Sequence, residues 1–204
     1  MLLKIHPETP SPRQISLVVD TLSRGGIIIY PTDTVYGIGC DIFHPKAIER
    51  IARIKNLDME KSHFSFICYD LSHLSDFTKQ IDSNVFKLLK RNLPGPFTFI
   101  LQANNKVPNT FTTKKKTVGI RVPDNNIARD IVRELGHPIL TTSVVTTDDI
   151  VEYFTDPGLL NETYGKLVDI VIDGGHGNNV PSTIVDCTKG EPEIIRQGLG
   201  ILDF

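Results

Sequence analysis

A stretch of polar residues, Pro31 to Gly39, directly follows a short run of large apolar residues, Ile27 to Tyr30. Thr32 and Thr34 bring hydroxyl groups that donate and accept hydrogen bonds, and Asp33 brings a carboxylate. Ligands of α/β proteins collect at the ends of buried strands, so the sequence predicts a ligand-binding loop here. A turn that satisfies its own backbone uses the same residue types, and the loop alone does not separate these two interpretations.

Two glycines, Gly37 and Gly39, follow Tyr36 in this loop and are expected to let the backbone turn tightly or approach a ligand closely. They do not form a dinucleotide-binding fingerprint, because Ile42 stands where the third glycine belongs. No segment matches the phosphate loop Gly-x4-Gly-Lys-[Ser/Thr] or the Gly-x-Ser-x-Gly elbow of serine hydrolases. No known spacing of metal ligands occurs either, so we expect no metal held by protein side chains alone.

Helix-like and strand-like segments alternate around this loop. Apolar residues recur at helical spacing over 13–22, 45–55, 85–90 and 127–135. Short runs rich in apolar and β-branched residues predict strands over 27–30, 64–69, 97–102, 118–122, 139–145, 168–172, 182–187 and 193–196. Strands outnumber helices, and a short turn joins the last two strands, so we expect one α/β domain over residues 1–204 with a mixed sheet.

The composition excludes several classes of protein. With 22 basic and 24 acidic residues the net charge is -2, which is not the basic excess of a protein that coats nucleic acid. No run approaches the roughly 18 apolar residues that cross a bilayer, and residues 1–10 lack the apolar stretch of a signal peptide. Cys40, Cys68 and Cys187 are far apart, so we expect a cytoplasmic protein without membrane partners, disulfides or structural zinc.

Together with further segments, in their order and spacing, the polar loop resembles the YrdC family, whose characterised members are threonylcarbamoyl-AMP synthases. The resemblance covers nearly the whole chain and rests on residues 25–39, 53–56, 94–99, 119–123, 143, 173–175, 181–186 and 196–198. It implies a twisted open mixed sheet with flanking helices around a large cavity. In the family this cavity holds ATP, L-threonine and bicarbonate together.

The resemblance also implies a reaction. A carbamate formed from threonine attacks the α-phosphorus of ATP, which gives pyrophosphate and threonylcarbamoyl-AMP for the modification of tRNA adenosine. Such transfers depend mainly on positioning and charge stabilisation. By resemblance, Lys55 and Arg121 are catalytic, and the threonine and bicarbonate site comprises Thr32, Thr34, Tyr36, Lys55, Arg121 and Ser182. The implied nucleotide site comprises Ser143, Thr183, Arg196, Lys61 and His63, and Mg²⁺ accompanies the ATP.

Three departures from the synthase pattern make the chain most similar to the YciO branch of the family. The synthases carry Lys-x-Arg where this chain has Lys55-Asn56-Leu57, and Lys61 or His63 would not replace the planar guanidinium. They carry Ser-x-Asn where this chain has Ser143-Val144-Val145. Arg196-Gln197-Gly198 replaces Arg-Pro-Gly, which keeps the cation and is expected to loosen the turn. A module that binds ATP, AMP, tRNA or double-stranded RNA without catalysis is therefore the alternative.

Overall fold

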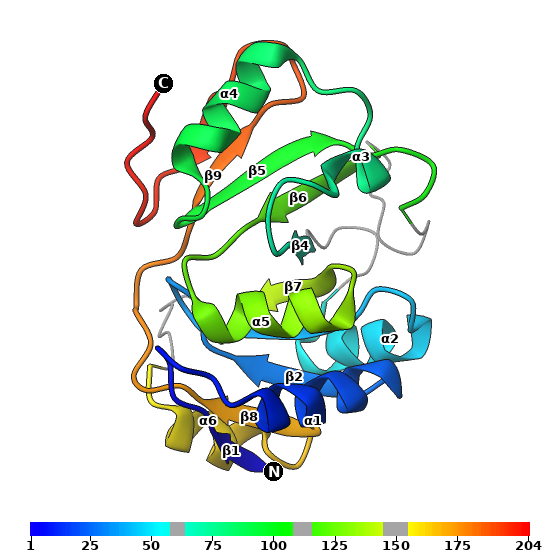
Figure 1. The fold of residues 1–204 in the computed structure, drawn as a ribbon, viewed down its shortest axis with the longest axis vertical. Coiled ribbons are helices and arrows are strands. Elements are labelled where there is room, and N and C mark those ends of the chain that lie inside the picture. The colour runs from blue at the N-terminus through cyan, green and yellow to red at the C-terminus, as the bar shows by residue number, and fades with distance from the viewer. Residues whose placement is uncertain (58–63, 108–115, 145–154) are drawn as a thin grey trace.

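The computed structural model describes residues 1–57, 64–107, 116–144 and 155–204 (Figure 1). Within them the strands form a ten-stranded sheet in the order β1-β8-β2-β3-β7-β4-β6-β5-β9-β10. Neighbouring strands pair in both directions, which confirms the mixed sheet: β2 is antiparallel to β3 and parallel to β8. The strands are β1 (Leu2–Lys4), β2 (Ile27–Tyr30), β3 (Gly37–Asp41), β4 (Ser65–Ile67), β5 (Phe97–Gln102), β6 (Thr117–Arg121), β7 (Ile139–Ser143), β8 (Ile170–Asp173), β9 (Thr183–Asp186) and β10 (Glu193–Arg196).

The helices flank this sheet, with α1 and α5 packed side by side (Figure 1). Local chemistry sets their ends. The Asn125 side chain accepts a hydrogen bond from the Ala128 amide at the start of α5, and Gly136 ends that helix at a φ of 80°. The helices are α1 (Pro12–Ser23), α2 (Pro45–Ile54), α3 (Leu74–Phe77), α4 (Ser83–Asn92), α5 (Asn126–Leu135) and α6 (Pro157–Tyr164).

The predicted helices and strands all occur in the structure, with ends shifted by a few residues. The sequence missed α3 and α6, and it missed β1 at the edge of the sheet. The prediction of a loop over Gly37 to Gly39 is wrong, because these residues begin β3. This strand pairs antiparallel with β2, and Ile29 lies opposite Ile38. Glycine is rare in strands, so the pattern Gly-Ile-Gly did not indicate one.

The glycines of β3 make room for a neighbouring side chain instead of turning the backbone. A Cβ atom on Gly37 would lie 3.0 Å from the Tyr30 ring, and one on Gly39 would lie 3.2 Å from that ring and 2.6 Å from the Leu140 carbonyl oxygen. The Tyr30 hydroxyl reaches across this gap and donates a 2.6 Å hydrogen bond to Thr141 Oγ1. The two glycines therefore allow a fully buried tyrosine to bridge β2 and β7.

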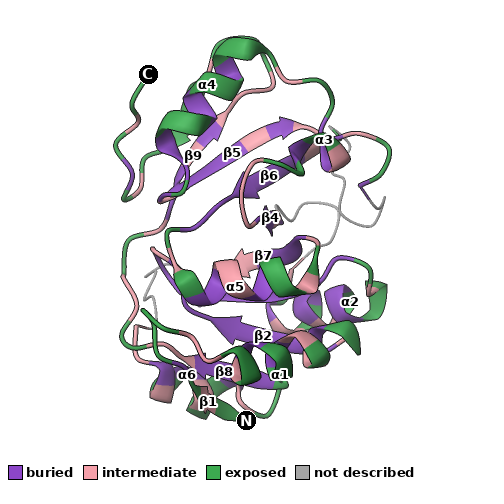
Figure 2. Ribbon diagram, in the orientation of Figure 1, coloured by how far each residue is buried: buried purple, intermediate pink, exposed green. Residues whose placement is uncertain are grey.

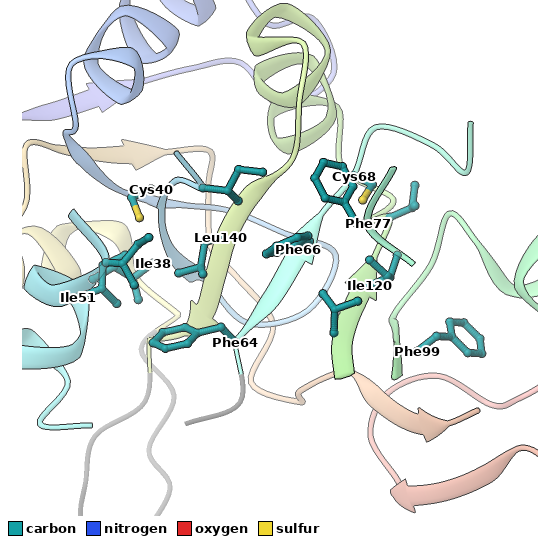
Figure 3. Close-up of a cluster of buried hydrophobic side chains, with 14 of the residues drawn as sticks. Ile38, Cys40, Ile51, Phe64, Phe66, Cys68, Phe77, Phe99, Ile120 and Leu140 are labelled. Atoms are coloured by element: carbon teal, nitrogen blue, oxygen red, sulfur yellow. The ribbon is translucent and has the colours of Figure 1, made fainter. Parts of the chain in front are cut away.

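Most residues of the central strands are buried (Figure 2), and their apolar side chains form two clusters. One cluster joins α1 and α5 to the sheet through residues such as Ile28, Ile67 and Ile131. The larger cluster, shown in Figure 3, runs from Ile51 of α2 across the sheet to Phe99 of β5. Burial of apolar surface on this scale, at about 25 cal/mol per Å², is the main favourable contribution to folding.

Two kinds of feature are absent from the described residues, a membrane-spanning helix and a cluster of metal ligands. None of the helices in the described part of the chain is both long and apolar enough to cross a membrane. Among the same residues, no three His, Cys, Asp or Glu side chains are grouped so that they could share a metal ion.

The close approach of Gly39 to Leu140 gives a test of this packing. We expect Gly39→Ala to lower the free energy of unfolding by about 2 kcal/mol, because the new methyl group meets a strand carbonyl that cannot move away. Urea titration followed by circular dichroism measures the change. A Gly39→Ala variant as stable as the wild type would contradict this account of β3.

Candidate functional site

A cavity of about 390 Å³ lies along the sheet from β3 to β10. This is the size of a small-molecule site. Side chains alternate along each strand, so every second residue faces the cavity. On β6 these are Thr117, Gly119 and Arg121, while Val118 and Ile120 between them belong to the apolar core. The large cavity implied by the resemblance is therefore present, and small polar side chains on one face of the strands leave the space for it.

Arg121, at the end of β6, is the cation most firmly held in the wall of this cavity. Its Nη2 atom donates to Asp33 Oδ1 at 3.0 Å and to Thr34 Oγ1 at 2.9 Å, so it connects β6 to the turn between β2 and β3. Asp33 also accepts a 3.1 Å hydrogen bond from the Asp124 amide through Oδ2. Only 10% of each of the Arg121 and Asp33 side chains is exposed. The predicted polar loop thus serves to fix a buried guanidinium.

Burial and ion pairing have opposite effects on the charge of Asp33. Burial raises the pKa of Asp33, and the positive charge of Arg121 opposes that rise. The Nε atom of Arg121 is buried, and no acceptor among the described residues meets it. A buried donor without an acceptor costs about 1–3 kcal/mol, so the position of Arg121 is maintained at a cost in stability.

A second cationic corner lies at the other end of the cavity. The Arg196 guanidinium donates to the Ser182 carbonyl oxygen through Nη2 at 2.7 Å and through Nε at 3.2 Å. The Ser182 hydroxyl in turn forms a 2.9 Å hydrogen bond with Thr98 Oγ1 on β5. The same cavity is lined by residues that are far apart in the sequence, namely Arg121, Arg196, Ser182, Ser143 and Tyr36.

The structure places Lys55 differently from these residues. It is the residue after α2, it is only 6% exposed, and it is not among the described residues of the cavity wall. Burial lowers the pKa of Lys55 to about 8, so the side chain is still mostly protonated at neutral pH. Two other predicted site residues, Lys61 and His63, lie outside the residues that the structure describes.

Several predicted hydroxyl groups are engaged in holding the backbone. Thr32 Oγ1 donates to the Val35 carbonyl oxygen at 2.8 Å and accepts from the Thr34 amide at 3.0 Å, which closes the turn. Tyr36 donates to the Gly175 carbonyl oxygen at 2.6 Å, and burial raises its pKa to about 12, so its hydroxyl stays neutral. Thr183 is fully buried, and its hydroxyl donates to the Gly200 carbonyl oxygen at 2.6 Å.

Other residues of the cavity wall escaped the sequence reasoning. Asp186, Thr188 and Lys189 line it near the turn between β9 and β10. Thr188 donates to Asp186 Oδ1 through both its amide and its hydroxyl, at 2.8 and 2.7 Å. The remaining cavity residues that had not been singled out are small or apolar, such as Ser65, Thr98 and Thr141. Period-two alternation within the predicted strands is the signal that could have found them.

Comparison with known proteins gives a consistent result. The family model described as "Telomere recombination", covering Sua5, YciO and YrdC proteins, matches residues 20–198. The chain is 39% identical to the uncharacterized protein YciO of Escherichia coli (strain K12), over 96% of this chain and 94% of that protein. It is 28% identical to a threonylcarbamoyl-AMP synthase of Coxiella burnetii (strain RSA 493), over 88% of this chain and 95% of the synthase.

Solved structures agree with these sequence relationships. The crystal structure of E. coli YciO superposes with a TM-score of 0.91 at 38% identity, covering 98% of this chain and 97% of that one. The crystal structure of P. abyssi Sua5 complexed with L-threonine gives a TM-score of 0.88 at 26% identity, covering 97% of this chain and 57% of Sua5. The twisted open mixed sheet around a cavity is therefore confirmed as the fold shared by these proteins.

The buried ion pair predicts a large stability cost for a small chemical change. Asp33→Asn leaves Arg121 charged in the cavity wall without its carboxylate, so we expect the free energy of unfolding to fall by about 3 kcal/mol. The matched control is Asp20→Asn, which breaks an exposed 3.8 Å pair with Arg24 and should cost within about 0.5 kcal/mol. Urea titration measures both. Equal effects of the two substitutions would contradict the account of the Asp33–Arg121 pair.

The pKa of Lys55 predicts a pH dependence of stability. The folded protein releases the Lys55 proton near pH 8, whereas the unfolded chain keeps it until about pH 10.5. The unfolded state therefore binds more protons in this range, and Lys55 makes the protein more stable as pH rises from 8 to 10.5. We expect Lys55→Met to remove this rise, as measured by urea titration at each pH. The control Lys46→Met, on the exposed face of α2, should retain it.

Proposed function

Because the chain belongs to the Sua5/YciO/YrdC family, we propose that it is an enzyme of the threonylcarbamoyl-AMP synthase type. It takes ATP, L-threonine and bicarbonate and releases threonylcarbamoyl-AMP and pyrophosphate, and the product serves the modification of adenosine in tRNA. The observation that carries the proposal is the single cavity of about 390 Å³ in which Arg121 and Arg196 meet the hydroxyl groups of Ser143 and Ser182. Its reactants are small, polar and anionic, as this wall requires.

We assign the corner of the cavity at Arg121 to threonine and bicarbonate. Both reactants carry a negatively charged group that a guanidinium can bind, and Asp33 and Thr34, which are not among the described residues of the cavity wall, hold that guanidinium in place. Thr32 and Tyr36 support the corner by fixing the backbone on either side of Thr34. The complex of P. abyssi Sua5 with L-threonine, a structural neighbour of this chain, supports the assignment.

We assign the corner formed by Arg196 and Ser182 to the nucleotide, with Ser143 lining the same cavity from β7. A guanidinium and hydroxyl groups are suited to phosphate oxygens, because charged donors give the stronger hydrogen bonds. Mg²⁺ enters with the triphosphate as part of the substrate. The carboxylate in the described wall, Asp186, already accepts two hydrogen bonds from Thr188, which fits an ion carried by phosphates better than an ion held by the protein.

In the proposed reaction the threonine nitrogen forms a bond to the carbon of bicarbonate, and water leaves. An oxygen of the resulting carbamate then bonds to the α-phosphorus of ATP while the bond to the pyrophosphate oxygen breaks. Arg121 and Arg196 orient the reactants and stabilise negative charge on them. Lys55, protonated at neutral pH, adds positive charge from the end of α2, and Lys61 and His63 remain candidates for phosphate contacts.

A second candidate function is binding without turnover, and the environment of Leu57 favours it. This residue stands where the synthases carry the arginine of Lys-x-Arg, and here it packs against the apolar core. The cavity would then hold ATP or AMP, or the protein would bind tRNA or double-stranded RNA. For either function we place the protein in the cytoplasm, because its three cysteines are free thiols.

Pyrophosphate release tests the proposal. Purified protein with MgATP, L-threonine and bicarbonate is expected to release pyrophosphate only when threonine is present, and Arg121→Met and Lys55→Ala should lower the rate at least tenfold. A coupled pyrophosphate assay measures the rate, and Asp20→Asn serves as the exposed control.

The same preparation separates the two candidate functions. If calorimetry detects ATP binding but threonine causes no release above that of the Lys55→Ala variant, the protein is a binding module and the enzymatic proposal fails. Binding of double-stranded RNA that weakens steeply as salt increases would favour the RNA version, because phosphate contacts release counterions.

A further inference from the structure

The segment that follows β10, residues 197–204, folds back over the start of β9 and onto α4, and we call it the strap. Its first turn encloses the Thr183 hydroxyl. Thr183 Oγ1 donates to the Gly200 carbonyl oxygen at 2.6 Å and accepts from the Gly198 amide at 2.9 Å. The Leu199 amide donates to the Pro181 carbonyl oxygen at 2.8 Å. The strap is thus bonded on both sides of Ser182.

Gln197 closes this turn from outside. Its Nε2 atom donates to the Gly200 carbonyl oxygen at 2.7 Å, to the Gly198 carbonyl oxygen at 3.1 Å and to Thr183 Oγ1 at 3.3 Å. The sequence led us to expect a looser turn where glutamine replaces proline. The structure differs, because side-chain hydrogen bonds hold the turn in place of a fixed φ.

The packing of the strap leaves little freedom of position. A Cβ atom on Gly198 would lie 2.2 Å from the Pro181 carbonyl oxygen, so the two backbones are in direct contact. Further along, the buried Asn92 of α4 pairs with Asp203 as a backbone strand would. Its Nδ2 atom donates to the Asp203 carbonyl oxygen at 2.8 Å, and its Oδ1 atom accepts from the Asp203 amide at 3.0 Å.

The strap acts on the cavity through Ser182 and Arg196. Arg196 donates to the Ser182 carbonyl oxygen. The peptide between Ser182 and Thr183 is fixed by a 3.0 Å hydrogen bond from the Thr183 amide to the Pro96 carbonyl oxygen. Arg196 also directly precedes the strap. The strap thus begins directly after Arg196 and encloses the Thr183 hydroxyl, next to the carbonyl oxygen that orients the guanidinium, while Pro96 holds the Thr183 amide.

We propose that Thr183 and Gln197 are positioning residues that set nucleotide affinity through Arg196, without touching the nucleotide. The inference rests on the proposed function, because it takes Arg196 as a phosphate contact. Thr183 does not line the cavity in the described residues, and all of its hydroxyl's bonds go to the strap. The resemblance placed Thr183 in the nucleotide site, and we assign it an indirect role there instead.

The experiment measures the dissociation constant of MgATP by calorimetry for isosteric variants. Thr183→Val removes the hydroxyl and is expected to weaken binding about tenfold, and Gln197→Met about threefold, because each side chain makes three hydrogen bonds in the turn. Thr183→Ser keeps the hydroxyl and should recover most of the affinity. The matched control is Gln14→Met, which loses a 2.6 Å hydrogen bond to the Lys4 carbonyl oxygen away from the cavity.

A double-mutant cycle distinguishes positioning from general stability. In an Arg196→Met background, Thr183→Val should have no further effect on the ATP dissociation constant, because its effect passes through the missing guanidinium. If Thr183→Val weakens binding equally in both backgrounds, or in neither, the inference is wrong while the proposed function stands. If the wild type binds no ATP, the proposed function fails, and the inference fails with it.

Discussion

The structure depends on the pairing of one buried charge, the guanidinium of Arg121, with the carboxylate of Asp33. Arg121 sits at the end of a strand in the sheet, where an unpaired guanidinium would cost several kcal/mol. Asp33 and Thr34 meet it from the turn between β2 and β3. One buried ion pair therefore joins strands that are not neighbours in the sheet, since β7 and β4 lie between β3 and β6. The curvature that brings these strands together also encloses the cavity.

Much of this fold was predictable because its signals are local. Helical spacing of Ala47, Ile48 and Ile51 indicated α2, and the run Ile27 to Tyr30 indicated a strand buried on both faces. The strand β3 was not predictable in this way, because Gly37 and Gly39 are selected by the ring of Tyr30, which belongs to another strand. Local propensity carries no information about a contact made across the sheet.

For the candidate site, too, the sequence indicated which residues take part but not which contacts they make. In the structure, Arg121, Arg196 and Ser182, which the sequence and its resemblance singled out, line one cavity. They did not show that the hydroxyl of Thr183 is consumed by the strap, nor that Asp33 is the partner of Arg121. A residue type indicates which bonds a side chain can make. Which bonds it does make depends on segments nearly ninety positions away in the sequence, as between Asp33 and Arg121, and only folding brings these together.

The positions at which this chain departs from the synthases explain why fold and activity can diverge. Leu57 lies shortly after α2 and Gln197 directly follows β10, so both lie beyond the ends of elements and outside the alternating faces of the strands, whereas Val145 falls outside the described residues. Substitution there leaves the core and the cavity-facing rows intact, which agrees with a TM-score of 0.88 to P. abyssi Sua5 at only 26% identity. The cavity persists because Gly119, Ser65 and Thr98 are too small to fill it. Its chemistry is therefore set at the ends of the elements, where leucine in place of the synthase arginine, as at Leu57, removes a charge from the ligand site and adds to the apolar packing.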